Sequence, residues 1–599
     1  MTKIHKSGKI SIAPLRSIFA MKKLLRFLKG YRAVSVLGML FKLLEAVNEL
    51  IIPLVVASII NVGINGGGGK AYVWKMGGVM LALGAVGLAL AVTAQYLASR
   101  ASQGFGTNLR SSLYRHINKL SMSEIDKFGT SGLLTRINSD SIQTQTGVAM
   151  FIRLVLRAPF LVVGALVMAV TISPKISIIF LIMAVIVSVI LWLVMSRTAP
   201  YYRKIQNNLD DVSLLTRENL SGARVVRAFS NQQEEQTDFY SSADALKRKS
   251  VKANAIAALL SPLTYVVINF AVIAVLYFGG KSVSLGNLES GDVVALVNYL
   301  SQILLALVAT ANFAVTFTKA AASAKRINEV FDTQPKIRDE IDTTPAPVEG
   351  SSKLEFDAVS FAYYDGGRCA LKNVNFALNS GQTLGIIGST GSGKSTVANL
   401  IPRFYEVTEG DILVDGINVR EYPMEALRAK IGLVPQKSVL FSGTIRDNLK
   451  YGNPDTTDDE IISALSAAQA LEFVSKLPEF LDAKVARGGK NFSGGQRQRL
   501  TIARALVAKP EILIFDDSAS ALDYATEAKL RKAIGELDFH PTVIQISQRA
   551  FSLAHADKIL VLDDGEQVGY GSHEELLKTC AVYREICRSQ VKSDEEVDA

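Results

Sequence analysis

Cysteine is scarce in this sequence. The 599 residues include three cysteines, Cys369, Cys580 and Cys587, whose spacing fits neither a metal site nor a disulfide framework. The expected state is three free thiols in the cytosol, where disulfides rarely persist. Histidine is also rare, with five residues in the chain, so few positions can exchange a proton near neutral pH.

Acidic residues are absent before Glu45, and no cleavable signal peptide is evident, because the first long apolar run is too long and begins too far along the chain. Nine basic residues precede the first apolar run: Lys3, Lys6, Lys9, Arg16, Lys22, Lys23, Arg26, Lys29 and Arg32. The positive-inside rule therefore predicts a cytoplasmic N-terminus. The stretch LRSIFAMKKLLRFLKG predicts a basic amphipathic helix on the inner leaflet, with a disordered tail as the alternative. The net charge of +10 thus points to a membrane and not to nucleic acid.

Long apolar runs fill the first half of the chain. The composition is 49% hydrophobic and the mean hydropathy is +0.25, which is high for a soluble protein. At ~20 apolar residues per crossing, we expect about six membrane helices. They centre on LGMLFKLLEAVNELIIPLVVASII, VMLALGAVGLALAVTAQYL, LVLRAPFLVVGALVMAVTI, ISIIFLIMAVIVSVILWLVM, PLTYVVINFAVIAVLYF and VVALVNYLSQILLALVATANFAV. The charged inner connections, 101–150 and 196–254, are long enough to continue the helices below the bilayer toward a cytosolic domain.

The periodicity changes in the second half. Short β-rich segments such as TLGIIG, EILIFDD and TVIQIS alternate with helical stretches, which is typical of an α/β domain around a parallel sheet. We therefore predict an α-helical transmembrane domain followed by an α/β domain. The predicted boundaries are a cytosolic N-terminal segment at 1–30, the transmembrane domain at 31–327, a linker at 328–352, the α/β domain at 353–590 and a polar tail at 591–599.

A phosphate-binding loop lies between a predicted strand and a predicted helix. The stretch TLGIIGSTGSGKSTVANL contains G-x-x-x-x-G-K-[ST], so backbone N–H groups can surround phosphates at the positive end of the helix. This pattern is typical of the phosphate-binding loop of P-loop ATPases, in which Lys394 is expected to reach the β- and γ-phosphates of ATP and the Ser395 hydroxyl to bind Mg²⁺. The predicted nucleotide-binding residues are Gly388, Ser389, Thr390, Gly391, Ser392, Gly393, Lys394, Ser395 and Thr396.

Two residues outside the loop extend this predicted site. Asp516 ends the apolar strand ILIFD and is the expected acidic residue of the magnesium shell. Tyr363, in FAYYDGG, lies about one strand and one turn before the loop, and it is expected to stack on adenine; a surface aromatic is the alternative.

The stretch FSGGQRQRL, residues 492–500, makes the pattern specific. The order of aromatic residue, Gly-rich loop, Gln436 in LVPQ, SGGQ, ILIFDD and SALD resembles the nucleotide-binding domain of ATP-binding cassette (ABC) proteins, and the membrane half resembles the exporter branch. The resemblance covers nearly the whole chain. It implies a half-transporter that dimerises, with ATP held between the loop of one subunit and the signature of the other. The site residues that it adds are Gln436, also near the metal, the signature residues Ser493, Gly494, Gly495 and Gln496, and Asp523.

Two positions depart from the family's pattern on the catalytic face. Asp517 stands where the family usually has a water-polarising Glu, and Gln548 stands where it has a His that contacts the γ-phosphate. The Asp carboxylate reaches about 1.5 Å less far, and Gln cannot shuttle a proton near neutral pH. Because the ATP-binding residues are retained, we predict a degenerate site that binds ATP and hydrolyses it poorly. Ala486 and Arg487 replace the Gly and Glu usual before the signature, so in this half the contact between cassette and membrane domain is either lost or asymmetric.

Four ionisable residues lie inside predicted membrane helices. Glu45 and Glu49 are one helical turn apart, as are Arg153 and Arg157. At 1.5 Å per residue they lie about 20–28 Å from the outer helix ends, in the inner part of the bilayer. Such groups pair with each other or line a cavity. Salt bridges, a cation-attracting wall of the substrate cavity and snorkelling at the inner interface remain the alternatives.

Together these features predict ATP-driven export of amphipathic or hydrophobic compounds, such as drugs or lipids, across the cytoplasmic membrane. The expected protein is multi-pass, with its ATPase domain in the cytoplasm and with ATP and Mg²⁺ as cofactors. The favoured partner is a second, different ABC half-transporter chain, whose competent site would be completed by the signature of this chain. The alternatives are a homodimeric exporter with a slow ATPase and an ATP-gated regulatory subunit.

Overall fold

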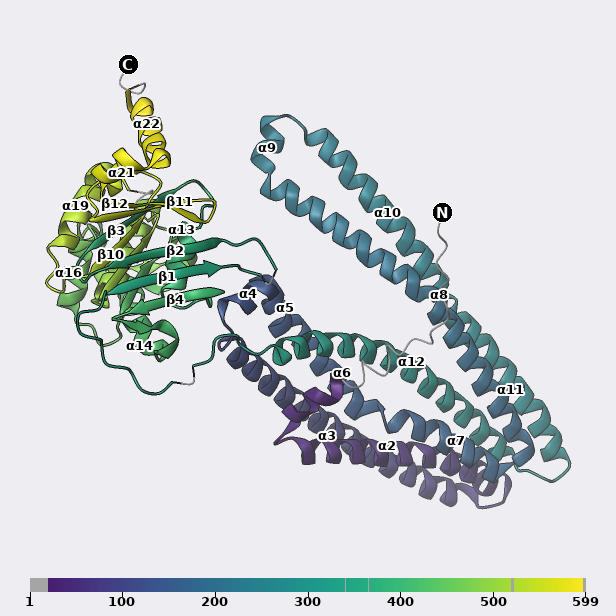
Figure 1. Ribbon diagram of the computed structural model, residues 1–599. Coiled ribbons are helices and arrows are strands. Elements are labelled where there is room, and N and C mark those ends of the chain that lie inside the picture. The colour runs from purple at the N-terminus through teal and green to yellow at the C-terminus, as the bar shows by residue number, and fades with distance from the viewer. Residues whose placement is uncertain (1–19, 340, 365, 519–521, 596–599) are drawn as a thin grey trace. The chain divides into compact units, whose positions relative to one another are not determined.

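The chain forms two compact units (Figure 1). The computed structural model describes residues 20–339, 341–364, 366–518 and 522–595. The helical unit comprises Met1–Asn118 and Thr130–Thr333, and the sheet unit comprises Lys119–Gly129 and Gln334–Ala599. The predicted basic segment up to residue 19 and the last four residues of the predicted tail lie outside the described residues.

Six helical segments in the described part of the helical unit are long and apolar enough to cross a membrane, which confirms the predicted architecture. They are formed by α2 (Arg32–Ser58) with its π-helical end (Ile59–Asn65), α3 (Gly69–Ile117), α5, α6 and α7 (Thr130–Thr135, Ser141–Leu154 and Arg157–Ile172), α8 (Pro174–Ser221), α10 and α11 (Gln232–Ala258 and Leu260–Ser284) and α12 (Ser290–Asp332). The 49 residues of α3 span about 73 Å, more than twice the ~30 Å of a bilayer core. These helices therefore continue beyond the bilayer, and α12 includes the first residues of the segment that we predicted as linker.

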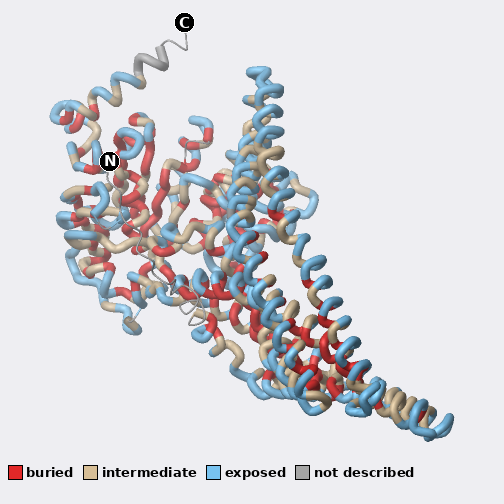
Figure 2. Tube along the Cα trace, turned by 90° about the vertical axis from the view of Figure 1, so that its right-hand side faces the viewer, coloured by how far each residue is buried: buried red, intermediate tan, exposed pale blue. Residues whose placement is uncertain are grey.

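Small residues pack the helices of this unit against each other. On α3, Ala94, Ala98 and Ala101 are fully buried, whereas Leu81 and Leu88 are 78% and 66% exposed. Figure 2 shows buried residues gathered where helices face one another and exposed residues on their outer sides. In a bilayer, small contact residues allow close helix approach and the exposed leucines face lipid.

A proline inside α2 leaves one backbone carbonyl without its helical donor. Pro53 has no N–H, so the carbonyl oxygen of Glu49, four residues earlier, loses its usual hydrogen bond. Gln302 of α12 donates its Nε2 to this oxygen at 3.2 Å, and the buried Tyr299 hydroxyl donates to the next carbonyl, that of Leu50, at 2.7 Å. Because hydrocarbon offers no water, donors from α12 make Pro53 tolerable at this depth.

The described start of the chain packs on the inner ends of two helices of the same unit. Residues 20–28 are helical, and Met21 and Leu24 are buried. Asn108 of α3 donates to the carbonyl of Phe27 at 3.1 Å, and the Phe27 ring stacks on Phe331 of α12 with 5.4 Å between centroids. The apolar side of the predicted amphipathic segment is thus covered, over these residues, by the protein itself.

The sheet unit is built on a ten-stranded sheet with the order β5-β4-β1-β2-β12-β11-β3-β10-β9-β6. Its strands are β1 (Leu354–Phe361), β2 (Leu371–Leu378), β3 (Thr383–Gly388), β4 (Glu409–Val414), β5 (Ile417–Asn418), β6 (Ile431–Val434), β9 (Ile512–Asp516), β10 (Thr542–Ile546), β11 (Lys558–Asp563) and β12 (Glu566–Gly571). Strands β11, β3, β10, β9 and β6 are parallel, as the predicted α/β domain requires, whereas β5, β4, β1 and β2 pair antiparallel. Strand β2 was not among the strands that we predicted.

The central strands are buried on both faces. Alternate residues of β9 and β10 enter two different cores, with Ile514 and Ile544 in one and Leu513, Phe515 and Val543 in the other. Parallel strands covered on both faces read as continuous apolar runs, which is why ILIF is so apolar. The helices beside the site are α13 (Lys394–Leu400), α18 (Gly494–Val507), α19 (Tyr524–Gly535) and α20 (Ala550–Leu553).

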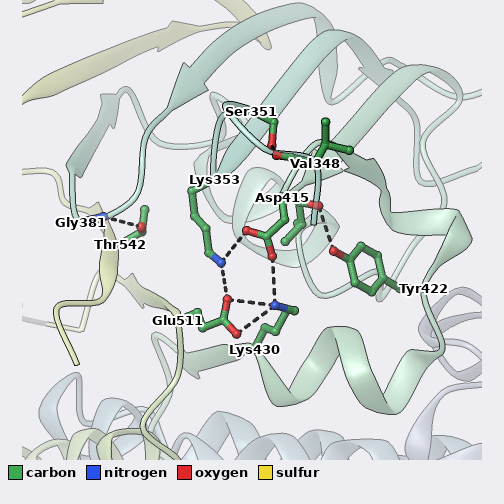
Figure 3. A network of polar contacts seen from close by, with 10 residues as sticks. Val348, Ser351, Lys353, Gly381, Asp415, Tyr422, Lys430, Glu511 and Thr542 are labelled. Carbon is green, nitrogen blue, oxygen red and sulfur yellow. Dashed lines mark hydrogen bonds and ion pairs between the residues drawn. The ribbon is translucent and has the colours of Figure 1, made fainter. Parts of the chain in front are cut away.

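Four alternating charges join the start of β1 to the amino ends of β6 and β9 (Figure 3). Lys353 pairs with Asp415 at 2.6 Å and also with Glu511, and Lys430 pairs with the same two carboxylates at 3.0 and 2.9 Å. Burial alone raises the pKa of these carboxyl groups. The hydrogen bonds from the two lysines outweigh it and lower the pKa of both Asp415 and Glu511.

We expect Asp415→Asn to lower the thermal unfolding midpoint and to reduce the free energy of unfolding by about 1–3 kcal/mol. The reason is that the change leaves two lysines to share the single carboxylate of Glu511. The Asp415 side chain is 11% exposed, whereas Glu511 is 47% exposed, so Glu511→Gln should cost less. A lowered folded-state pKa stabilises the fold above the ordinary carboxyl pKa of about 4, and this contribution is lost as the pH falls through the folded value. The difference between wild type and Asp415→Asn should therefore be equal at about pH 7 and about pH 5 and shrink below about pH 4. A difference that does not shrink there would contradict this assignment.

Candidate nucleotide site

The phosphate-binding loop leaves β3 and enters α13, as its sequence predicts. A Cβ at Gly388 would lie 2.0 Å from the carbonyl oxygen of Leu562, so no side chain fits between the loop and β11. Gly393 caps α13 with a φ of 97°, and a Cβ there would lie 2.6 Å from the carbonyl of Ala370. Close backbone approach therefore requires glycine at both positions.

The side chain of Lys394 lies inside this loop. Lys394 is 9% exposed, and its Nζ donates to the carbonyls of Gly388 at 2.9 Å and Ser389 at 2.6 Å. Burial lowers the pKa of Lys394, although Asp517 and Asp516 favour its charged form. Its ammonium group is thus held among neutral carbonyls, where the oxygens of a bound phosphate would be stronger acceptors.

Ser395 and Asp516 meet at the end of β9. The Ser395 hydroxyl donates to Asp516 at 2.8 Å, and Asp516 is 9% exposed. Burial, aided by the charge of Asp517, raises the pKa of Asp516, and the Ser395 hydrogen bond opposes this effect. These two oxygens suit a hard cation such as Mg²⁺. No group of three or more His, Cys, Asp or Glu side chains in the described ranges could hold a metal, so phosphate and water oxygens would complete its coordination.

The two departures from the family's pattern lie together beside this pair. Asp517 Oδ2 accepts from Gln436 Nε2 at 3.3 Å and from Gln548 Nε2 at 3.5 Å. The backbone of Asp517 is left-handed, with a φ of 46°, and its N–H donates to Ile546 of β10 at 3.1 Å. The structure thus brings Gln436 and the predicted switch residue Gln548 to the carboxylate of the predicted base, Asp517, at the carboxyl edge of the parallel strands.

The predicted adenine-stacking residue belongs to an aromatic group. Tyr363 is 38% exposed, its hydroxyl lies 3.1 Å from Thr396 Oγ1, and its ring meets Tyr405 edge-on at 5.2 Å. The Tyr405 hydroxyl donates to Asp126 at 2.6 Å. Asp126 lies on α4 (Met122–Phe128), a helix that the chain places between α3 and α5 but whose residues belong to the sheet unit. Burial and this hydrogen bond raise the pKa of Tyr405, so its hydroxyl stays protonated.

The remaining loop residues are arranged around the phosphate position. Ser392 Oγ lies 3.4 Å from Lys394 Nζ, and the Ser389 hydroxyl donates to Asp563 at 3.5 Å. Gly391 and Thr390 are exposed between them.

The signature residues occupy the start of α18. Ser493 and Gln496 form a capping box, in which Gln496 N–H donates to Ser493 Oγ at 3.2 Å and Ser493 N–H donates to Gln496 Oε1 at 2.9 Å. Nothing lies within 4 Å of a Cβ built at Gly494, and Gly495 is partly exposed, so this helix end is open. Among the described residues, no hydrogen bond joins the signature to the loop 388–396 of the same chain.

Asp523 caps the helix that follows β9. Its carboxylate accepts from Thr526 N–H at 2.8 Å and from the Thr526 hydroxyl at 2.9 Å, and these bonds lower the pKa of Asp523. The three residues before Leu522, part of the SALD turn, lie outside the described residues.

In the helical unit, three of the four predicted ionisable residues form ion pairs. Arg157 lies 2.8 Å from Glu49 and 3.8 Å from Glu45, and Lys42 lies 2.6 Å from Glu45. Arg153 instead donates to Ser99 at 3.0 Å. The Glu49 side chain is 37% exposed and that of Glu45 is 15% exposed, so Glu49 is the more accessible acid.

Several residues of these arrangements were not identified from the sequence. Tyr405 and Asp126 are far apart in the chain, and only the aromatic pair in RFYEV could have drawn attention to Tyr405. Pro53 inside a predicted membrane helix implies an unpaired carbonyl, which signals a polar partner on another helix, but it does not say that Gln302 supplies it.

Comparisons with known proteins agree with this geometry. Residues 35–307 match the family described as ABC transporter transmembrane region, and residues 371–520 match the family described as ABC transporter. An uncharacterised ABC transporter ATP-binding protein of Mycobacterium tuberculosis (strain ATCC 25618 / H37Rv) is 39% identical over 94% of this chain and 97% of its own length. An ATP-dependent lipid A-core flippase of Haemophilus influenzae (strain 86-028NP) is 31% identical over 80% of this chain and 82% of its own length.

A solved structure is also similar over nearly the whole chain. The structure of a bacterial Atm1-family ABC exporter with ATP bound covers 93% of this chain and 99% of its own, with a TM-score of 0.79 and 27% identity. Both the membrane helices and the nucleotide-binding sheet fall within this match. The chain therefore belongs to the ABC transporter family, as a multi-pass, exporter-type half-transporter with one ATPase domain.

Proposed function

We propose that this chain is one half of a heterodimeric ABC exporter of the cytoplasmic membrane, with its ATPase domain in the cytoplasm, and that its own ATP site is degenerate. The observation that carries the proposal is the arrangement around Asp517. Its carboxylate is one carbon shorter than that of the usual Glu, and it accepts from the amides of Gln436 and Gln548. A carboxylate held by two amides is a weak and badly placed base for a water molecule, so hydrolysis is slow.

The rest of the site supports retained ATP binding. The loop glycines, Lys394, Ser395 and Asp516 have the arrangement that triphosphate and Mg²⁺ require. Tyr363 offers a partly exposed ring for adenine. A site with all of its binding groups and an altered base and switch residue is best suited to hold ATP for long periods.

The signature supports a role at a second site. Ser493 and Gln496 preorganise the amino end of the 14-residue α18, which is a natural anion-binding end. The phosphate-binding loop of the same chain already has its own helix end, that of α13, to bind the phosphates of ATP. The signature of this chain therefore serves ATP bound to a partner, which would supply the catalytic Glu and His that this chain lacks.

The inner loops provide the contacts that couple ATP to transport. Helix α4 is held in the sheet unit through Asp126 and Tyr405. Helix α9 (Ala223–Ala228) presents Val225, 60% exposed, and is followed by Phe229, 77% exposed, which offers an apolar contact for the partner's ATPase domain. We propose that closure of two ATP sites moves these helices and exports an amphipathic or hydrophobic compound. The Haemophilus relative, named as a lipid A-core flippase, is consistent with a lipid-like substrate.

The first test is the Mg-ATPase rate of the full chain purified alone, with Lys394→Ala as the blank. We expect measurable ATP binding and a rate equal to the blank. Asp517→Glu combined with Gln548→His should raise the rate by roughly 10²-fold or more, because it restores the base and the switch residue. Asp455→Glu, on an exposed loop, is the control for the same chemical change. A fast wild-type rate that Lys394→Ala abolishes would instead favour a homodimer in which Asp517 is the base.

Tyr405→Phe tests the contact between the ATP site and α4. The change removes the hydroxyl that binds Asp126 and keeps the ring beside Tyr363. We expect ATP affinity to change little and transport per ATP hydrolysed by the assembled exporter to fall severalfold, since one hydrogen bond to a charged group is worth about 1.5–3 kcal/mol. Tyr570→Phe, which also removes one hydroxyl bond, to Ala377, is the matched control. Equal transport ratios in both variants would contradict the coupling role.

Glu49→Gln tests the part played by the membrane ion pairs. Glu49 is the most exposed carboxylate beside Arg157, so it is the one that a cationic substrate can reach. We expect the KM for a monocationic amphipathic compound to rise roughly fivefold and that for its neutral analogue to stay unchanged, as about 1 kcal/mol of charge attraction is lost. Equal shifts for both compounds would mean that Glu49 only stabilises the helices.

A further inference from the structure

A cavity of about 290 Å³ lies in the sheet unit behind the strands that carry the ATP site. Its floor includes Phe515 of β9 and Val543 of β10, and one wall is α19, through Leu530 and Ile534. Ligand pockets start at about 300 Å³, so the space suits a molecule of the size of one amino acid. The cavity does not include the loop 388–396 or the signature.

Two opposite charges line this cavity without pairing with each other. Glu527 and Arg531 are four residues apart on α19, a spacing at which Glu and Arg usually form an ion pair. No ion pair joins them, and Arg531 makes no side-chain hydrogen bond within the part of the chain that the structure describes. Both side chains take part in the cavity lining instead.

The state of Glu527 is energetically unfavourable. Glu527 is 5% exposed, and neither carboxylate oxygen has a hydrogen-bond partner among the described residues. The nearest cation is Arg549, whose Nη1 lies 4.0 Å from Glu527 Oε2 and whose guanidinium lies over the Tyr524 ring at 4.9 Å. A buried carboxylate without donors is costly, and a ligand in the cavity can supply the missing donors.

We propose that this cavity binds a free zwitterionic amino acid with an apolar or aromatic side chain. The ammonium group of the ligand pairs with Glu527, its carboxylate pairs with Arg531, and its side chain lies on Phe515, Leu530 and Val543. An apolar surface that carries a few polar groups of fixed position is the usual construction of a small-molecule site. Because Glu527 and Arg531 lie four residues apart on α19, they suit a ligand whose two opposite charges lie close together at one end.

The position of the cavity connects it to ATP. Strand β9 continues from Phe515 into Asp516 and Asp517, and β10 ends at Ile546, two residues before Gln548. An occupied cavity fixes these strands and α19 together. The ligand would therefore act on the same strands whose ends hold the ATP-site carboxylates.

The test uses three probes on the full-length protein in lipid nanodiscs, with binding measured by calorimetry. L-phenylalanine carries both charges, 2-phenylethylamine lacks the carboxylate, and 3-phenylpropanoate lacks the ammonium. We expect L-phenylalanine to bind at least roughly tenfold more tightly than either analogue, since each charge-assisted contact is worth about that factor or more. Glu527→Gln should reduce its affinity to that of 3-phenylpropanoate, and Arg531→Gln should reduce it to that of 2-phenylethylamine.

Matched controls come from the last turn and the C-cap of α19. Lys532 and Glu536 form an exposed pair with the same spacing, 3.8 Å apart, outside the cavity, so Lys532→Gln and Glu536→Gln should leave binding unchanged. If one variant fails to fold, the three probes are compared on the wild type and on the other variant, and this comparison still tests the proposal. The proposal is overturned if L-phenylalanine binds no better than its analogues, or if its affinity survives both Glu527→Gln and Arg531→Gln.

Discussion

The hydrogen bond from the Ser395 hydroxyl to the Asp516 carboxylate is the contact on which the ATP site depends. It joins the first turn of α13 to the end of β9. It can form only because β3, β10 and β9 are parallel neighbours, so their carboxyl ends reach one edge of the sheet. The same edge gathers Lys394, Asp517 and the amides that hold it. A shift of β9 by one residue would turn Asp516 into the core and disperse all of these groups.

Buried polar groups need hydrogen-bond partners in both units, but the two units supply these partners differently. In the sheet unit, Lys394 is buried with only neutral acceptors, two carbonyls and the Ser392 hydroxyl, and Glu527 is buried with no hydrogen-bond donor among the described residues. Both groups are incompletely satisfied by the chain itself, which is the condition for binding an external ion or molecule. In the helical unit, by contrast, Gln302 satisfies the carbonyl freed by Pro53. There the surrounding lipid supplies no donor, so the donor for this carbonyl has to come from a neighbouring helix.

Much of this architecture follows from local sequence patterns. Unbroken apolar runs gave the six crossings, and the Gly-rich loop between strand and helix gave the positions of Lys394 and Ser395. Strand β2 was missed because LKNVNFAL alternates with asparagines, which weakens its β-signal. Tyr405 and Asp126 could not be paired from the sequence, since 279 residues separate them. The ion pair of Arg157 with Glu49, 108 residues away, was one of several alternatives for the same reason. Local chemistry can be read from residue order, whereas contacts between distant segments depend on packing that one sequence does not encode visibly.

The hydrogen bond from Gln302 that compensates for Pro53 limits which substitutions this protein can accept during evolution. A relative that loses Pro53 regains the N–H for the Glu49 carbonyl, and Gln302 is then free to change. If Gln302 is lost while Pro53 remains, the Glu49 carbonyl is left without a hydrogen-bond donor in the membrane. Substitutions at these two positions, on different helices and 249 residues apart, are therefore tolerated in one order and penalised in the other. The proline in one helix thus sets the order in which substitutions can accumulate at these two positions.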